Sequence, residues 1–145
     1  MATSLHAAAL AITRRLNGTG DRMRDYWTFP GFQDLYLEDS WVLGISQDTN
    51  QLTFVVDVVL RESHPFYQPP PVGEQYCYRR GRIRFEEITS LSWTGPSALP
   101  AVDAVGELDF GSFDEFEERD GAYMIAGDFG RLEIFSHEPI LEFLD

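Results

Sequence analysis

The chain holds few side chains of the kind that carry out catalysis at neutral pH. Its three histidines are His6, His64 and His137, and its one cysteine is Cys77. A catalytic zinc ion usually takes three protein ligands, two of them often closely spaced on one element. No two of these histidines are spaced in that way, so we predict neither a metal site nor a cofactor. One enzyme hypothesis stays open, a hydrolase in which His64 acts with an acid such as Asp57.

Two further features suggest a catalytic or metal-binding role, but each has a simpler structural interpretation. Cys77 lies between Tyr76 and Tyr78 in a segment with strand composition, where a small buried hydrophobic residue is the ordinary role. Residues 128–130 spell the Asp-Phe-Gly tripeptide that holds metal in protein kinases, but the chain has no glycine-rich phosphate loop and no His-Arg-Asp segment. We therefore interpret the tripeptide as a turn. We predict no catalytic residue and expect a protein that is not an enzyme.

An arginine cluster is more informative. Arg79, Arg80, Arg82 and Arg84 surround Gly81. On a strand with regular alternation, Arg80, Arg82 and Arg84 share one face. Such a stripe can bind a carboxylate or a phosphate. Alternatively it pairs with the acidic stretch at 103–120, which is the interpretation that we favour.

The acidic stretch itself has two interpretations. Residues 107–120 hold seven acids against a single arginine, and three phenylalanines interrupt them. Such a run is usually a solvated face with its rings turned inward. The functional hypothesis is a patch that docks a basic protein and uses its aromatic rings as anchors. The residues that we predict for this patch are Asp109, Phe110, Asp114, Glu115, Phe116, Glu117 and Glu118.

A proline-rich loop supplies a second binding hypothesis. Residues 63–74 contain four prolines, which remove hydrogen-bond donors and favour an extended, polyproline-like path. The loop can act as a lid over a small-ligand pocket in a β-domain. The residues that we predict to line this pocket are His64, Tyr67, Tyr76, Tyr78 and Arg80.

The net charge of −13 restricts the partners that we expect. It disfavours binding to a nucleic-acid backbone or an anionic membrane, and it favours electrostatic steering toward a basic protein. A single cysteine suits a reducing compartment, and no segment approaches the ~18 apolar residues of a membrane helix. We therefore expect a cytoplasmic protein. The sequence leaves the oligomeric state open.

The elements that position these residues are mostly strands. Residues 1–24 carry a helical spacing of apolar residues and form a short N-terminal helix or tail, while 25–145 form a single β-rich domain. Segments 35–46 and 52–62 alternate like the strands of a hairpin, with Trp41, Leu43 and Ile45 on one face of the first. The fold class is therefore mainly β, an antiparallel β-sandwich or partly open barrel with one short N-terminal helix.

The central segment at 75–93 allows two connections. A β-bulge at Gly81 puts Tyr76 and Tyr78 on the same face as Ile83 and Phe85. A tight hairpin at Gly81 puts the same side chains opposite one another. We favour the bulge, because Arg-Gly is a poor two-residue turn.

Four segments together resemble a group of known proteins. They are residues 37–43 (LEDSWVL), 76–81 (YCYRRG), the spacing of apolar residues across 85–93, and 127–130 (GDFG). The pattern resembles small acidic bacterial β-proteins, some of which are similar to immunity proteins of polymorphic toxin systems. This resemblance covers about residues 26–145. It implies an intracellular protein without enzymatic activity that neutralises a partner by binding it.

Overall fold

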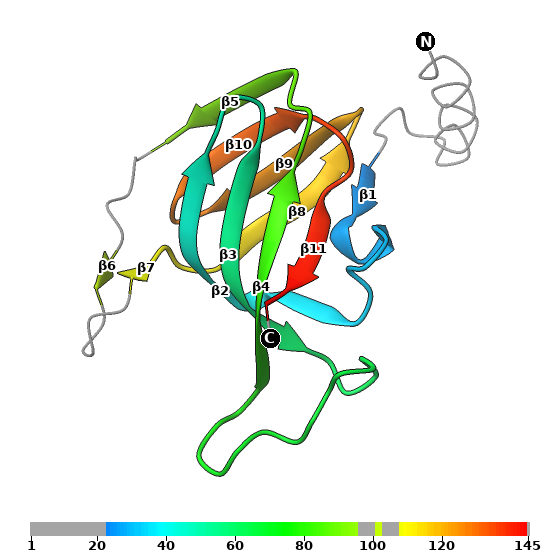
Figure 1. Ribbon diagram of the computed structural model, residues 1–145, viewed down its shortest axis with the longest axis vertical. Helices are drawn as coiled ribbons and strands as arrows, with labels where there is room; N and C mark the ends of the chain where they lie inside the picture. Colours follow the sequence, from blue (N-terminus) through cyan, green and yellow to red (C-terminus); the bar gives the residue numbers. More distant parts are fainter. Residues whose placement is uncertain (1–22, 96–100, 103–107, 145) are drawn as a thin grey trace.

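The computed structural model describes residues 23–95, 101–102 and 108–144 (Figure 1). The predicted N-terminal helix lies outside the described residues, except that Met23 and Arg24 belong to the strand β1 (Met23–Asp25). The described part contains one helical element, the short 3₁₀ turn η1 (Tyr26–Thr28). A short N-terminal helix is therefore not part of the described fold. In this part of the chain, no helix is long and apolar enough to cross a membrane.

Two antiparallel sheets face each other, which confirms the prediction of a mainly β, sandwich-like fold; they do not close into a barrel (Figure 1). The five-stranded sheet, here called sheet A, has the order β1, β8 (Phe113–Arg119), β9 (Ala122–Gly127), β10 (Gly130–Phe135), β5 (Ser90–Thr94). The four-stranded sheet, here called sheet B, has the order β11 (Ile140–Phe143), β4 (Cys77–Phe85), β3 (Leu52–Leu60), β2 (Leu35–Gln47). Two short strands, β6 (Ala101–Val102) and β7 (Leu108–Asp109), pair with each other.

Strand β3 contributes a continuous row of apolar side chains to the core. Its alternation is regular, so every second side chain points between the sheets, and all five of these are buried: Leu52, Phe54, Val56, Val58 and Leu60. Phe54 packs edge-on against Phe129 of the opposite side, with ring centroids 5.6 Å apart. At one end of the sandwich, Phe29 and Phe32 follow the 3₁₀ turn and are fully buried. Apolar burial of this kind supplies most of the stabilising free energy of such a fold.

The predicted hairpin between 35–46 and 52–62 is confirmed, but the predicted faces of its first strand are wrong. Strand β2 pairs antiparallel with β3, and its register shifts between Tyr36 and Trp41 and again between Val42 and Gly44. These irregularities reverse the alternation. Trp41 is therefore 42% exposed on the outside of sheet B, and Val42 is fully buried.

Both predicted connections at Gly81 are wrong. Strand β4 pairs with β3 without interruption, from Cys77 opposite Leu60 to Phe85 opposite Leu52. Tyr78 therefore lies on the outer face, opposite to the face of Phe85. The presence of a glycine at position 81 has another explanation. A Cβ atom at Gly81 would lie 3.0 Å from the backbone oxygen of Glu142 in β11. Beyond Phe85 the chain crosses over to sheet A, where β5 pairs with β10.

Candidate functional site

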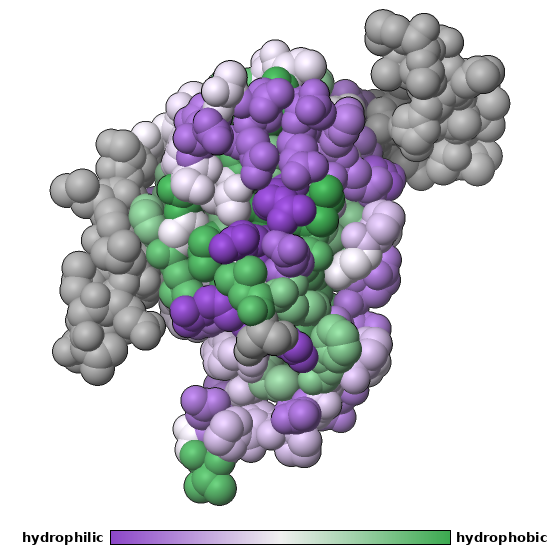
Figure 2. Space-filling view, viewed as in Figure 1, coloured by the Kyte–Doolittle hydropathy of each residue, from purple (hydrophilic) through white to green (hydrophobic). Residues whose placement is uncertain are grey.

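The outer face of sheet B brings the arginine cluster and several aromatic residues together. The regular alternation of β4 places Arg80, Arg82 and Arg84 on this face, as predicted. In Figure 2 apolar and hydrophilic residues are interspersed over the middle of the side on which sheet B lies.

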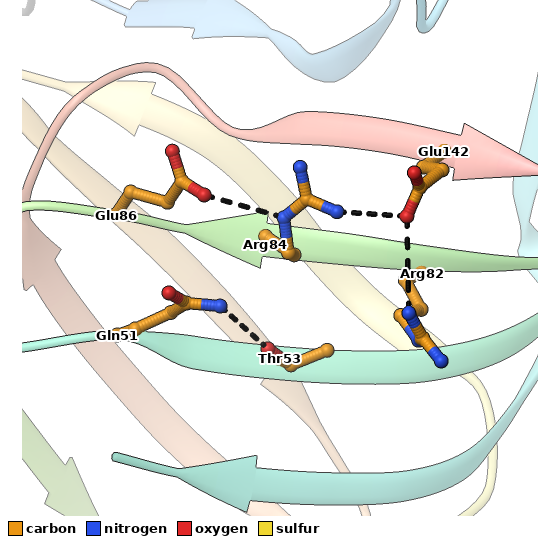
Figure 3. Close-up of polar contacts among 6 residues, drawn as sticks. All are labelled: Gln51, Thr53, Arg82, Arg84, Glu86 and Glu142. Carbon is orange, nitrogen blue, oxygen red and sulfur yellow. Dashed lines mark hydrogen bonds and ion pairs between the residues drawn. The ribbon is translucent and has the colours of Figure 1, made fainter.

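The arginines pair with acids of their own sheet. Arg80 binds Asp57 of β3 through both carboxylate oxygens, with Nε 2.8 Å from Oδ1. Arg84 donates to Glu142 of β11 at 2.8 Å, and Arg82 lies 3.9 Å from the same carboxylate (Figure 3). The prediction that they pair with the stretch at 103–120 is therefore wrong. With their charges matched locally, the three arginines do not form a positive stripe.

Four aromatic side chains continue this face toward the end of β3 and the start of β4. We call Tyr36, Tyr76, Tyr78 and Trp41 the aromatic row. The Tyr76 ring meets Tyr36 and Tyr78 edge-on, with centroids 6.4 and 6.0 Å apart. The Trp41 Nε1–H donates to the Tyr78 hydroxyl at 3.3 Å. Trp41 and Tyr78 remain 42% and 38% exposed, so the row offers ring surface to a partner.

Hydrogen bonds within sheet B and a cation–π contact hold the aromatic row in place. Ser40 fills the register shift of β2: its hydroxyl donates to the backbone oxygen of Tyr36 at 2.8 Å and accepts from the N–H of Val59 at 2.9 Å. The Arg61 guanidinium stacks on the Tyr36 ring, 4.9 Å from its centroid. The row is therefore held in place before any partner binds, which lowers the entropic cost of binding.

The Tyr76 hydroxyl has an unusual partner. It donates a hydrogen bond to the Asp39 carboxylate. This bond, with burial and the charge of Asp39 in addition, raises the pKa of Tyr76 to about 12. The bond ties the segment before β4 to the irregular part of β2.

A pocket of about 290 Å³ lies beside the aromatic row, next to the proline-rich loop. Two of the residues predicted for a ligand pocket, Tyr67 and Tyr76, line it. The other three, His64, Tyr78 and Arg80, do not. The full lining consists of Tyr36, Val59, Leu60, Arg61, Glu62, Tyr67, Gln75, Tyr76 and Cys77. Cys77, predicted to be a buried hydrophobic residue, is only partly buried at this pocket.

The acidic stretch forms β8, with rings turned inward. Phe116 is 4% exposed and belongs to the core, so its ring is not on the surface that we predicted for a partner. Phe110 is half-buried against the core. The side chain of Asp109 lies outside the described residues.

Three glutamates of β8 are held by arginines. Glu115 accepts from Arg131 at 2.6 Å, Glu117 from Arg119, and Glu118 from Arg24 at 2.7 Å. Glu118 is only 5% exposed, so its charge is not presented to a partner. Of the predicted patch, Asp114, Glu115 and Glu117 retain carboxylates on or near the surface.

The two groups of the hydrolase hypothesis are engaged elsewhere. The His64 Nδ1 accepts the N–H of Phe66 at 3.0 Å, and its ring packs edge-on against Phe143. Burial lowers the pKa of His64. The Asp57 carboxylate is bound by Arg80. Among the described residues, no cluster of three or more His, Cys, Asp or Glu side chains is arranged to hold a metal ion.

Comparison of the chain with protein-family models, curated proteins and solved structures finds no match. The resemblance to immunity-type proteins therefore stays a prediction. Sequence reasoning missed Trp41, Tyr36 and Asp39 as parts of this surface. Trp41 was recognisable as a large aromatic residue in a predicted strand. The sequence does not clearly indicate the register shifts of β2 that turn its side chain outward.

Proposed function

We propose that this protein is a non-enzymatic, cytoplasmic interaction module of immunity type, and that a basic protein partner docks on the outer face of sheet B. One observation carries the proposal. Trp41 and Tyr78 are about 40% exposed on a rigid sheet, next to arginines that are already paired with acids. Tryptophan, tyrosine and arginine are the residues that most often dominate the binding energy of protein interfaces.

The charge of the chain supports a basic partner. A net charge of −13 attracts a basic protein over several ångströms and speeds the encounter, whereas anchoring requires desolvated contacts. The aromatic row supplies such contacts on a preorganised surface. The acidic strand β8 lies in the other sheet, so steering and anchoring are divided between different parts of the surface.

The experiment compares capture of a partner by three forms of the protein. The full chain is immobilised on a resin as the bait and incubated with an extract of its source cells. The bound proteins are identified by mass spectrometry. We expect the double variant W41A/Y78A to lose a basic partner, at a cost of about 2–4 kcal/mol in binding. The matched control is Phe135→Ala, which removes a ring of similar exposure (37%) from the outer face of sheet A. A basic partner that the double variant captures as well as the unmodified chain does would contradict the proposal.

A second set of variants separates anchoring from steering. Reversing Asp114, Glu115 and Glu117 to Lys changes the charge of sheet A and leaves the aromatic row intact. We expect weaker capture at low salt and little change at high salt, because screening removes the steering term. Loss of capture at every salt concentration would move the anchoring site to β8.

The pocket beside the proline-rich loop supports a second candidate, the binding of a small ligand. Its volume of about 290 Å³ is near the lower limit for ligand pockets, and three tyrosines line it. The single cysteine gives a direct assay, since Cys77 lies in the lining. A bound small molecule is expected to slow the alkylation of Cys77 by iodoacetamide, and Tyr67→Ala to reduce that protection. A compound that stabilises the protein without protecting Cys77 would place its site elsewhere.

A further inference from the structure

The four edges of the two sheets differ in how they are protected against pairing with another strand. An exposed edge offers unpaired N–H and C=O groups, and proteins usually guard it with charges, prolines, bulges, short strands or covering loops. Strand β1 has only three residues, and β11 has four residues with Glu142 in ion pairs. Strand β2 has two register shifts, and its Val42 exchanges backbone hydrogen bonds with Phe110 and Gly111.

Strand β5 is the longest of the three short edge strands, and its own residues carry no charge, proline or bulge. Its sequence, Ser-Leu-Ser-Trp-Thr at 90–94, is uncharged and contains no proline, in a chain of which 24% is charged. It pairs with β10 in continuous register on one side. On its other side no described residue pairs with it, and it ends the sheet. The edge is five residues long, and within the described ranges no other strand occupies it.

The side chains of β5 also leave apolar surface at this edge. Leu91 lies opposite Ile134, and Trp93 lies opposite Leu132, so both point toward the interior of the sandwich. Trp93 is nevertheless 41% exposed, at the strand that ends sheet A among the described residues. Its indole is fixed by a hydrogen bond from Nε1 to the backbone oxygen of Phe129 at 2.9 Å. A strand added to β5 would cover this ring.

We propose that the β5 edges of two copies of this chain pair antiparallel, so that sheet A continues across a two-fold axis at Ser92. The segment is self-complementary about this residue. Leu91 of one copy faces Trp93 of the other, twice, and Ser92 faces its equivalent. Cross-strand pairs of an aromatic and an aliphatic residue are favourable, and no like charges face each other along the strand. A C₂ contact of this type closes after two copies.

The charge of the chain sets the conditions under which the pair forms. Each copy carries a net charge of −13, so two copies repel one another at low ionic strength. Five paired residues form a small interface, which makes a weak dimer. We therefore expect a monomer in dilute, low-salt solution and a dimer at high protein concentration in high salt, where the repulsion is screened. The β5 edge belongs to sheet A and is separate from the proposed partner site on sheet B.

The first test measures mass in solution. Sedimentation velocity of the full chain over a range of protein and NaCl concentrations should show conversion of the 16.5 kDa monomer to twice that mass as both rise. Ser92→Glu places two like charges at the two-fold axis and should abolish the dimer. The matched control is Ser46→Glu, which adds the same charge at an exposed serine of β2 in sheet B and should leave the dimer in place.

The second test traps the pair and does not depend on a loss of association. Residues directly opposite each other in antiparallel strands have Cβ atoms about 4.5–5.5 Å apart, close to the separation that a disulfide spans. In a Cys77→Ser background, Ser92→Cys should give a disulfide-linked dimer under mild oxidation in high salt, and Ser46→Cys should give little. A chain that stays monomeric at high concentration and high salt, and that shows no preferential cross-link at residue 92, overturns the proposal. So does a dimer that Ser92→Glu leaves unchanged, or a monomer that instead accepts a strand from a different protein at this edge.

Discussion

Tyr76 shows how one acidic neighbour changes the chemistry of a side chain in the aromatic row. Its hydroxyl donates to Asp39, and the negative charge of that carboxylate disfavours a phenolate beside it. The folded pKa of Tyr76 is about 12, above the ~10 of an unfolded tyrosine. The stability that this bond contributes is therefore fully present below about pH 10 and is lost as the pH rises through the folded pKa.

Replacing Asp39 tests this coupling. In the variant Asp39→Asn the carboxylate charge is gone, so the pKa of Tyr76 should fall from about 12 toward the ordinary value. NMR titration of the tyrosine Cζ resonances measures the pKa of each ring separately. A Tyr76 pKa that the substitution leaves unchanged would show that Asp39 does not control this hydroxyl.

At the scale of elements, what the sequence predicts well is local alternation. The five apolar residues of β3 repeat with a period of two, and the structure buries all of them. The same rule fails at Trp41, because β2 has register shifts, at the first of which the Ser40 hydroxyl accepts the Val59 N–H. Of the candidate site, only the shared face of Arg80, Arg82 and Arg84 was predicted correctly. The expected irregularity at Gly81 put Tyr76 and Tyr78 on the apolar face, and the outward position of Trp41 requires the tertiary structure.

Gly81 is a second case in which local reasoning was insufficient. A glycine inside a strand predicts either a bulge or a close approach of another backbone, and only the position of β11 decides between them. The contact is tight: a Cβ atom would lie 3.0 Å from the Glu142 backbone oxygen and 3.2 Å from Leu141 Cδ1. The C-terminal strand therefore packs so closely on Gly81 that a side chain there would require its neighbours in β11 to shift by a few tenths of an ångström.

Gly81→Ala is expected to lower the free energy of unfolding by about 1–2 kcal/mol, because β11 must move away to admit the methyl group. The matched control is Gly44→Ala in β2, where the nearest atom to an added Cβ is a side-chain carbon of Val55 at 3.8 Å. This change should be neutral or stabilising by about 0.5 kcal/mol, since it reduces the freedom of the unfolded chain. Urea unfolding of both variants measures the two values. Equal effects of the two substitutions would contradict the close approach of β11.

For the whole molecule, charge is the dominant property. The ion pairs at Arg80, Arg84 and Arg131 attract locally, and salt weakens them. The chain nevertheless has 24 acids against 11 basic residues, so most of its long-range electrostatic energy is repulsion between carboxylates. Since exposed ion pairs contribute little each, screening the repulsion should outweigh the loss of the pairs.

The thermal midpoint of unfolding at pH 7 should therefore rise with NaCl, by roughly 3 °C or more between low salt and ~0.5 M. Differential scanning calorimetry at low protein concentration measures it without a contribution from self-association. The control uses the same protein near its isoelectric point of about 4.4, where the net charge is close to zero and the midpoint should hardly change with salt. A midpoint that falls with NaCl at pH 7 would show that the local ion pairs outweigh the repulsion. The acidic surface would then be a folded-state network that stabilises the protein, and it would be less available to steer a basic partner.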